Sequence, residues 1–151
     1  MAEYIVRPIG VVRSALKEPA DAPKQGALTG QEAEIVVDPA YLPALDGLER
    51  RVAPAGKAVL GGARRKDGKI VVICWMHIAD RGRLKVHPQG QEDLPERGVF
   101  STRSPHRPNP VSLHTVTLLS IAGNVLRVRG MDAIDGTPVV DIKSHSPELD
   151  G

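Results

Sequence analysis

Short apolar stretches separated by turn residues run along most of the chain, and they predict β-strands. The stretches are rich in Val and Ile, whose branched side chains favour extended backbone, and Gly, Pro, Asn or Asp lies beside most of them. Pro8 and Gly10 interrupt the first stretch, so we expect two strand pieces with a bend between them within residues 4–14. The other expected strands are residues 34–38, 69–78, 84–87, 99–101, 111–121, 124–131 and 139–143.

Strict alternation marks the strand expected at residues 124–131. Successive side chains of a strand point to opposite faces, so Leu126 and Val128 share one face and Arg127 and Arg129 share the other. We therefore expect one face of this strand in the core and the other in solvent.

The longest expected amphipathic strand changes phase part-way along. Its apolar positions are Val111 and Leu113 at the start but Val116 and Leu118 further on. A regular strand keeps its apolar residues on one face, so this shift predicts a bulge or a strong bend near residues 114–115.

One short helix is expected after residue 38. Asp38 is a suitable N-cap and Pro39 suits the first turn of a helix. Four apolar residues follow at helical spacing and are expected to face the core: Tyr41, Leu42, Leu45 and Leu48.

These elements predict a mostly-β fold: a small β-barrel with one short helix and long functional loops. Closing a sheet of short strands into a barrel removes its exposed edges. The length of 151 residues fits one domain, which we expect to span residues 1–151 with a tail at 144–151. Aromatic residues make up only 3% of the chain, so the core must consist of Val, Leu, Ile and Ala.

Charge and cysteine content narrow the cellular setting. The formal net charge of +2 is too small to indicate a nucleic-acid partner on its own. No apolar run approaches membrane-spanning length, and the N-terminus lacks the apolar core of a signal peptide. Cys74 is the single cysteine, which excludes an internal disulfide and favours a cytoplasmic protein. Its place in an apolar strand indicates an inert core residue.

Residues 98–113 hold the densest group of candidate functional side chains. Pro105, Pro108 and Pro110 restrict the backbone there and exclude a helix. The stiff loop displays side chains able to recognise anions or bases, namely Arg103, His106, Arg107 and Asn109. Such pre-ordered polar loops are typical of binding and catalytic sites.

A second charged feature is the basic segment, residues 50–69. It contains one acidic residue, Asp67, and seven basic residues: Arg50, Arg51, Lys57, Arg64, Arg65, Lys66 and Lys69. The segment is interrupted by glycines, and it is either a solvated face or an RNA contact.

Spacing argues against several chemistries. The five histidines show no zinc-ligand spacing, and Ser101, Ser104 and Ser112 lie in no nucleophile elbow although His106 is near them in sequence. His77, near the end of a strand, is either a core residue or part of a site. The stiff loop, with Asp132 and Asp135 in a later turn, suits a nitrogen-rich ligand such as a nucleoside.

Residues 98–113 resemble the signature of the TsaA-like family, also called TrmO or VirR-like. Three further motifs are similar to those of this family: residues 9–14 with 17–18 and 23–26, then residues 75–77, and residues 132–143. The likeness covers about residues 5–143. Ser112 stands where glycine is common in the family, and the basic segment replaces an aromatic run.

The resemblance implies a small β-barrel, usually a homodimer, that binds S-adenosyl-L-methionine. Because the methyl donor is already activated, we expect no metal. Members methylate N6 of a threonylcarbamoyl-modified adenosine beside the tRNA anticodon. The implied cofactor residues are Pro23, Lys24, Gln25, His77, Arg103, Leu113, Met131 and Asp132. The candidates for catalysis or substrate orientation are Asp132, Asp135, Asn109 and Arg107, with Lys143 as a further signature position.

Two classes of function remain open at this point. One is a tRNA methyltransferase, which the basic segment and the two arginines at 127 and 129 favour weakly. The other is a cofactor-binding protein that methylates a smaller substrate or senses the cofactor.

Overall fold

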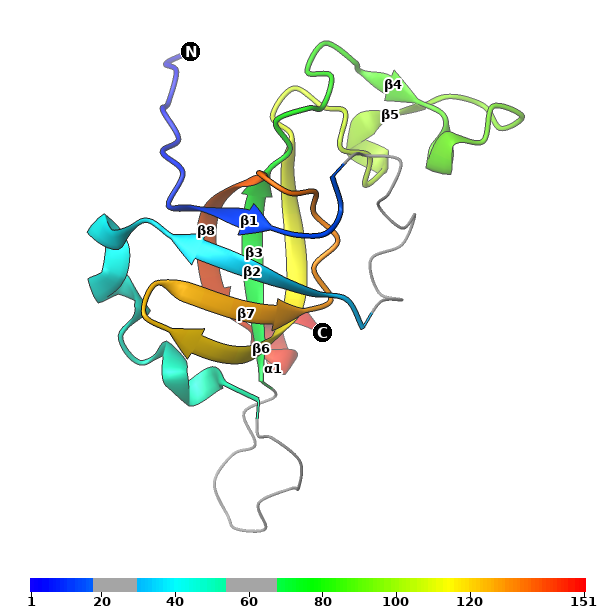
Figure 1. Cartoon of the computed structure of the whole chain (residues 1–151). Coiled ribbons are helices and arrows are strands. Elements are labelled where there is room, and N and C mark those ends of the chain that lie inside the picture. Colours follow the sequence, from blue (N-terminus) through cyan, green and yellow to red (C-terminus); the bar gives the residue numbers. More distant parts are fainter. Residues whose placement is uncertain (18–29, 54–67) are drawn as a thin grey trace.

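Six strands close into a barrel in the computed structural model, which describes residues 1–17, 30–53 and 68–151. The strand order around the barrel is β1-β2-β7-β6-β3-β8, and every neighbouring pair is antiparallel (Figure 1). The barrel strands are β1 (Gly10–Arg13), β2 (Glu32–Val37), β3 (Lys69–Trp75), β6 (Val111–Ala122), β7 (Val125–Arg129) and β8 (Pro138–Ser144). The expected mostly-β barrel is therefore confirmed.

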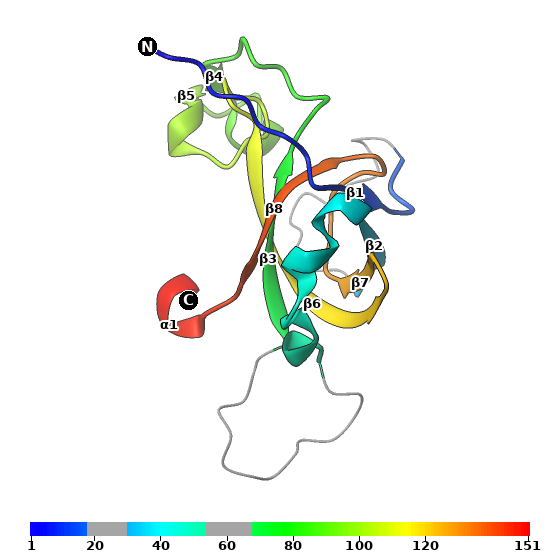
Figure 2. The same ribbon diagram turned by 90° about the vertical axis from the view of Figure 1, so that its left-hand side faces the viewer.

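Short elements flank the two ends of the barrel. A two-stranded ribbon rises above one end, and we call residues 84–101 the flap (Figure 2). The flap contains β4 (Lys85–Val86), η5 (Pro88–Gly90), β5 (Arg97–Gly98) and η6 (Val99–Ser101). η3 (Pro39–Leu45) runs alongside the barrel next to β1 and β2, and η4 (Leu48–Arg51) and α1 (Pro147–Asp150) lie further from the flap.

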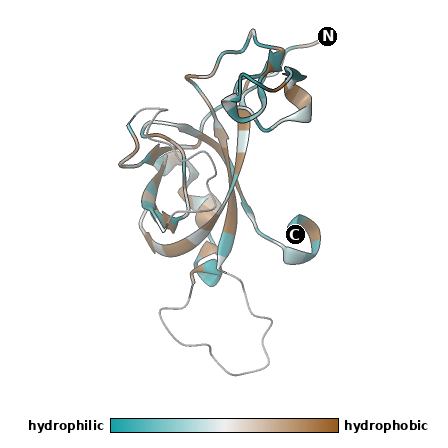
Figure 3. Ribbon diagram, turned by 90° about the vertical axis from the view of Figure 1, so that its right-hand side faces the viewer, coloured by the Kyte–Doolittle hydropathy of each residue, from teal (hydrophilic) through white to brown (hydrophobic). Residues whose placement is uncertain are grey.

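Aliphatic side chains fill the barrel. Alternate residues of each strand point inward, and hydrophobic positions follow the barrel strands in Figure 3. The largest fully buried apolar side chains include Val12, Ile35, Ile70, Val72, Leu118, Leu126, Val128, Met131 and Val139. Leu126 and Val128 are buried while Arg127 and Arg129 are exposed, as the alternation of β7 predicted.

The N-terminal strand is shorter than expected. Only Gly10–Arg13 is a strand, and no strand piece forms before it. Pro8 lacks an N–H group, and the first ladder-like bond is donated by Ile9 to the carbonyl of Val139 at 2.8 Å. Gly10 serves a close approach: a Cβ there would lie 2.5 Å from the carbonyl oxygen of Val36.

Residues 99–101 are not a strand but the 3-10 turn η6. The hydroxyl of Ser101 donates to the carbonyl of Gly98 at 2.7 Å, and that of Thr102 donates to the carbonyl of Val99 at 2.9 Å. These side-chain bonds stabilise a local turn in place of a ladder. Val99 is buried, and Phe100 projects into solvent with 84% of its surface exposed.

β6 contains no bulge at residues 114–115. Its pairing with β3 continues without interruption from Val111 to Thr117, and the register irregularity lies further on, between Leu118 and Ser120, opposite β7. The phase change therefore reflects a change of surroundings: Val111 and Leu113 are 41% and 58% exposed on the outer face.

The expected cap of the first helix is confirmed, because Asp38 Oδ1 accepts a hydrogen bond from the N–H of Ala40 at 2.9 Å. The helix itself is 3-10, with Pro43 inside it. Tyr41, Leu45 and Leu48 pack against the core, but Leu42 is 42% exposed and was wrongly assigned to it.

Candidate functional site

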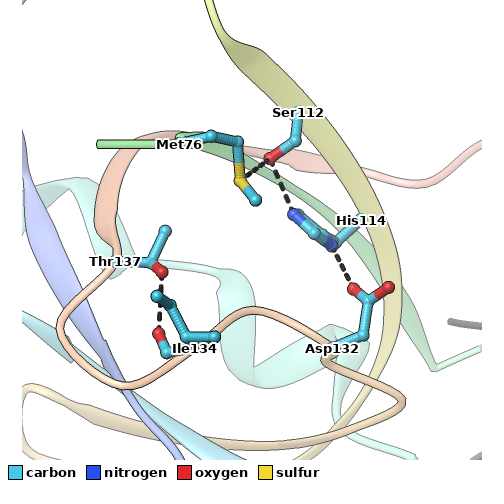
Figure 4. A network of polar contacts seen from close by, with 6 residues as sticks. All are labelled: Met76, Ser112, His114, Asp132, Ile134 and Thr137. Carbon is cyan, nitrogen blue, oxygen red and sulfur yellow. Dashed lines mark hydrogen bonds and ion pairs between the residues drawn. The ribbon is translucent and has the colours of Figure 1, made fainter. Parts of the chain in front are cut away.

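Three segments meet at the barrel end below the flap. Met76 directly follows β3, Ser112 and His114 lie near the start of β6, and Asp132 follows β7. Figure 4 shows their side chains converging from these separate elements. Each of the three segments also carries one of the sequence motifs, so the fold brings the motifs together.

A continuous chain of polar contacts links these side chains. The Ser112 hydroxyl lies 3.2 Å from Met76 Sδ and 2.8 Å from His114 Nε2, and His114 Nδ1 lies 2.7 Å from Asp132 Oδ1. The side chains of His114 and Asp132 are only 10% and 25% exposed. A carboxylate can only accept, so Nδ1 of His114 carries a proton and donates it to Asp132.

Asp132 is held in its ionised form. The hydrogen bond from His114 lowers the pKa of the Asp132 carboxyl below its ordinary value, and the nearby charge of Arg103 acts in the same direction. Partial burial opposes these effects without reversing them. The site therefore presents a fixed negative charge with a guanidinium near it.

Local sequence explains this arrangement. Ser112 and His114 are two residues apart in a strand, so both point to the same, inner face. Gly130, with φ of 90°, turns the chain after β7, and its N–H donates to the carbonyl of Gln31 at 2.9 Å. Met131, 1% exposed, then anchors the backbone beside Asp132 in the core.

The turn after Asp132 is also fixed from inside the barrel. Thr137 is buried, and its hydroxyl donates to the carbonyl of Ile134 at 2.7 Å (Figure 4). Ala133 and Ile134 are buried with it. Asp132 is thus displayed from a packed loop, which limits its movement.

Arg107 holds together the stiff loop of residues 98–113, which we also call the proline-rich loop. Its Nη2 donates to the carbonyls of Val99 at 2.7 Å and Thr102 at 3.2 Å. These contacts join the end of the flap to the loop. The role that the structure assigns to this guanidinium is therefore to shape the loop.

The turn after β3 braces the same loop from outside. Arg81 Nε donates to the carbonyl of Pro108 at 2.8 Å, and its guanidinium lies 5.1 Å from the ring centroid of Trp75. His106 Nδ1 accepts from the N–H of Asp80 at 3.0 Å. The predicted stiffness of residues 98–113 thus has support beyond the prolines.

Asp135 has different partners from Asp132. One carboxylate oxygen accepts from the N–H of Ser14 at 3.0 Å, and the other lies 2.9 Å from Lys17 Nζ. The N–H of Asp135 donates to the carbonyl of Leu16 at 2.6 Å. The bond from Ser14, followed by the one from Lys17, lowers the pKa of Asp135. Asp135 therefore anchors the chain just before residues 18–29.

The remaining predicted site residues are spread around this end and beyond it. Arg103, Asn109 and His77 are exposed, and Leu113 lies on the outer face of β6. Pro23, Lys24 and Gln25 fall outside the described residues. Lys143 lies near the far end of β8, 3.8 Å from Asp141.

Lys143 borders a separate cleft between β8 and the two 3-10 helices. Arg50 and Arg51 of the basic segment line this cleft with Asp46 and Asp141. Arg51 Nη1 also donates to the carbonyl of His145 at 2.8 Å. Most of the basic segment, residues 54–67, lies outside the described residues.

His114 was not singled out from the sequence, and Ser112 was considered only as a hydrolase nucleophile. The signal that would have found them is alternation: in an unbroken strand, both polar residues share the face of Val116 and Leu118. Cys74, in contrast, is buried as expected, and burial raises the pKa of its thiol to about 12. Among the described residues, no group of three His, Cys, Asp or Glu side chains is arranged to hold a metal ion.

Comparison with known proteins identifies the family. The model of the tRNA-methyltransferase O N-terminal domain matches residues 58–151, more than half of the chain. This chain belongs to the TrmO family. Its TrmO-family relatives include a probable S-adenosyl-L-methionine-binding protein of Methanothermobacter thermautotrophicus, 46% identical over 98% of this chain and 94% of that protein. The S-adenosyl-L-methionine-binding protein of Archaeoglobus fulgidus is 43% identical over 97% of this chain and 92% of that protein.

Solved TrmO structures share the fold. One TrmO crystal structure is 31% identical with a TM-score of 0.75, covering 99% of this chain and 61% of that chain. TrmO from Pseudomonas aeruginosa is 28% identical with a TM-score of 0.72, covering 99% and 59%. This chain thus spans about three fifths of the length of those TrmO chains. In the part of the chain that the structure describes, no helix has the length and apolar character needed to cross a membrane.

Proposed function

We propose that this protein is an S-adenosyl-L-methionine-dependent methyltransferase that methylates N6 of threonylcarbamoyl-modified adenosine beside the tRNA anticodon. The observation that carries the proposal is the ionised Asp132 carboxylate, bonded to His114 and close to the charge of Arg103, in a TrmO-family barrel.

The two charged side chains of the site fit the cofactor. Its amino-acid end carries both an ammonium and a carboxylate, and Asp132 and Arg103 offer the two complementary charges close together. The cofactor supplies an activated methyl group on a sulfonium. We assign cofactor contacts to Arg103 and Asp132 first, and then to Pro23, Lys24, Gln25, His77, Leu113 and Met131.

The protein's main task in this reaction is to position the reactants. A methyl donor that is already activated needs alignment with the acceptor amine, and the braced proline-rich loop and the buried turn after Asp132 provide rigid walls. Among the catalytic candidates, we assign Asp132 and Asn109 to substrate contact, because their side-chain oxygens can accept hydrogen bonds. Arg107 and Asp135 act in this proposal by holding the loops in place.

Two measurements test the proposal in sequence. Calorimetric titration with S-adenosyl-L-methionine should show saturable binding, because charge-complementary groups are preassembled. Incubation with tRNA carrying the threonylcarbamoyl modification, followed by nucleoside mass spectrometry, should show one added methyl group on that nucleoside. Binding without any methylated tRNA would overturn the tRNA assignment.

The second candidate function is a cofactor-binding protein that acts on a small molecule or senses the cofactor. It is favoured by the names of the archaeal relatives, which state cofactor binding alone. Salt-sensitive binding of tRNA by the purified protein separates the two candidates, because phosphate contacts release counterions.

A homodimer in the cytoplasm is part of the proposal. Large apolar side chains are exposed on the flap and next to it, including Phe100 at 84%, Leu84 at 64% and Leu113 at 58%. Exposed apolar groups of this size are typical of association surfaces. The single buried cysteine supports a reducing compartment.

A further inference from the structure

The chain of contacts at the barrel end has a direction. Asp132 Oδ1 accepts from His114 Nδ1 at 2.7 Å, which leaves His114 Nε2 facing the Ser112 hydroxyl at 2.8 Å. In this tautomer Nε2 is an acceptor, so the Ser112 proton points to it. The oxygen of Ser112 then keeps lone pairs that can accept a hydrogen bond from a bound ligand.

We propose that Ser112 and His114 form a proton relay for the methyl acceptor, with Asp132 holding the histidine ring. This inference rests on the proposed methyltransferase function and deepens it by naming the group that takes the proton. A serine, histidine and aspartate relay is recognised by geometry and by roles, and the distances here meet the geometric requirement.

The proton accounting requires such a group. When the acceptor N–CH3 bond forms and the donor C–S bond breaks, the electron pair of the latter stays on sulfur, and the amine must release its proton. The proton passes from the amine to Ser112 Oγ while the serine proton moves to His114 Nε2. The imidazolium so formed is stabilised by the Asp132 carboxylate, and it returns the proton to water after product release.

The surroundings of His114 suit a transient positive charge. The Asp132 carboxylate faces its Nδ1, and the Met76 sulfur, 3.2 Å from the Ser112 hydroxyl, is a weak competing acceptor. The guanidinium of Arg103 also acts on Asp132 and, as a cation, opposes a second positive charge, so the direct bond to Asp132 must outweigh it. The Cys74 thiol is neutral, because burial raises its pKa to about 12.

The first test is a spectroscopic one on the cofactor-free protein. Nitrogen NMR of ring-labelled histidine should show His114 with Nδ1 protonated and Nε2 unprotonated at pH 8. In Asp132→Asn, the amide NH2 can donate to Nδ1, so the proton should move to Nε2. A wild-type ring protonated on both nitrogens at pH 8, or on Nε2 alone, would overturn the relay independently of any activity.

The second test is kinetic and compares His114→Gln with wild type. Glutamine keeps hydrogen-bonding groups but cannot accept the proton, so single-turnover methylation of tRNA should slow by roughly 10²-fold or more. The pH dependence of the rate should flatten, while cofactor Kd and thermal midpoint stay near wild type. The matched control is His87→Gln on the flap, a histidine 3.5 Å from Glu96, which should react normally.

Ser112→Gly and Ser112→Ala separate the relay from simple packing. Both remove the hydroxyl and should slow the step in the same way, although glycine is common at this position in the family and fits the backbone. Normal rates and an unchanged pH profile in His114→Gln and Ser112→Ala, with active wild type, would overturn the relay alone. A wild-type protein that binds the cofactor but methylates no tRNA would overturn the proposed function, and the relay's role in methyl transfer with it.

Discussion

Two aspartates of one motif have been given different tasks by their neighbours. Asp132 bonds to the partly buried His114 and faces the site, whereas Asp135 bonds to Ser14 and Lys17 and fixes a chain segment. Both carboxyls have a lowered pKa, but for different reasons. A perturbed carboxyl group is therefore evidence for function only once its partner is known.

Arg103→Ala should weaken cofactor binding. The guanidinium stands close enough to Asp132 to influence its charge, and removing a charge-assisted contact costs about 1.5–3 kcal/mol, or roughly ten- to hundred-fold in Kd. Calorimetric titration measures the change. Arg129→Ala is the matched control, because Arg129 is exposed on the outer face of β7 near Glu32. Equal affinities of a folded Arg103→Ala protein and wild type would remove Arg103 from the site.

Asp132→Asn should reduce the loss of stability in acid. The folded-state pKa of Asp132 lies below the ordinary value of about 3.9, so below that pH the unfolded state binds more protons than the folded state. Its contribution is thus present above about pH 4 and is lost as pH falls towards the folded-state pKa. Denaturant unfolding at about pH 5 and pH 3 should show a smaller difference in Asp132→Asn. An identical pH dependence of the free energy of unfolding in both proteins would contradict the lowered pKa of Asp132 in the folded state.

At the level of elements, β6 shows what the sequence could and could not predict. Its existence follows from the apolar pattern, but its pairing with β3 and the placement of Val111 and Leu113 do not. Val111 and Leu113 lie on the outer face, because alternation along an unbroken strand places them opposite the inward-facing Ser112, His114 and Val116. An apolar pattern does not distinguish residues that the chain's own core covers from residues that a partner molecule covers.

The candidate site was likewise predicted only in part, because some of its features are set by local sequence and others by the fold. The stiff loop and the motif of residues 132–143, here called the closing motif, could be located, because prolines and turn residues act locally. The Ser112–His114–Asp132 chain depends on the register between β6 and the loop after β7, which no local pattern specifies. Likewise, Arg107 has the residue type of a ligand contact, and only the fold reveals its bonds to the backbone of the loop.

Asp135→Ala tests the tether between the closing motif and the N-terminal segment. Loss of the carboxylate removes the bonds to Ser14 and Lys17, so the Ser14 amide should exchange its hydrogen faster with solvent. Cofactor affinity should fall with it, since the tethered chain leads to Pro23, Lys24 and Gln25. Asp135→Asn is the control, because its side-chain oxygen can still accept from Ser14. Unchanged exchange at Ser14 would show that the tether is not needed.

For the whole molecule, we expect a homodimer that depends on exposed apolar residues. Phe100→Asp places a charge on a side chain that is 84% exposed, so it should leave the barrel folded while weakening association. Light scattering over a range of concentrations measures the mass, and circular dichroism checks the fold. A wild-type protein that is monomeric and fully active would contradict the dimer, and a dimeric Phe100→Asp protein would move the interface elsewhere.

The last prediction concerns how the barrel would hold tRNA, the substrate in the proposed function. The proline-rich loop is too short to bind tRNA alone, and the basic segment has the densest positive charge in the sequence. Its described end, η4, brings Arg50 and Arg51 to a cleft shared with Lys143, towards the barrel end opposite the flap. Arg64, Arg65 and Lys66 lie outside the described residues, so their part in binding is predicted from sequence.

Neutralising Arg64, Arg65 and Lys66 together should weaken tRNA binding and flatten its salt dependence. Each lost phosphate contact should reduce the logarithmic slope by about 0.9 or less. Cofactor affinity should stay unchanged, because these residues lie outside the cofactor motifs. The control removes the same charge from the flap and the residue just before it, at Arg83, Lys85 and Arg97. If both triple variants lose tRNA affinity equally, net charge alone explains the binding. If the first variant keeps the wild-type salt slope, the basic segment is a solvated face. If it loses the cofactor, the separation of cofactor and RNA surfaces is wrong.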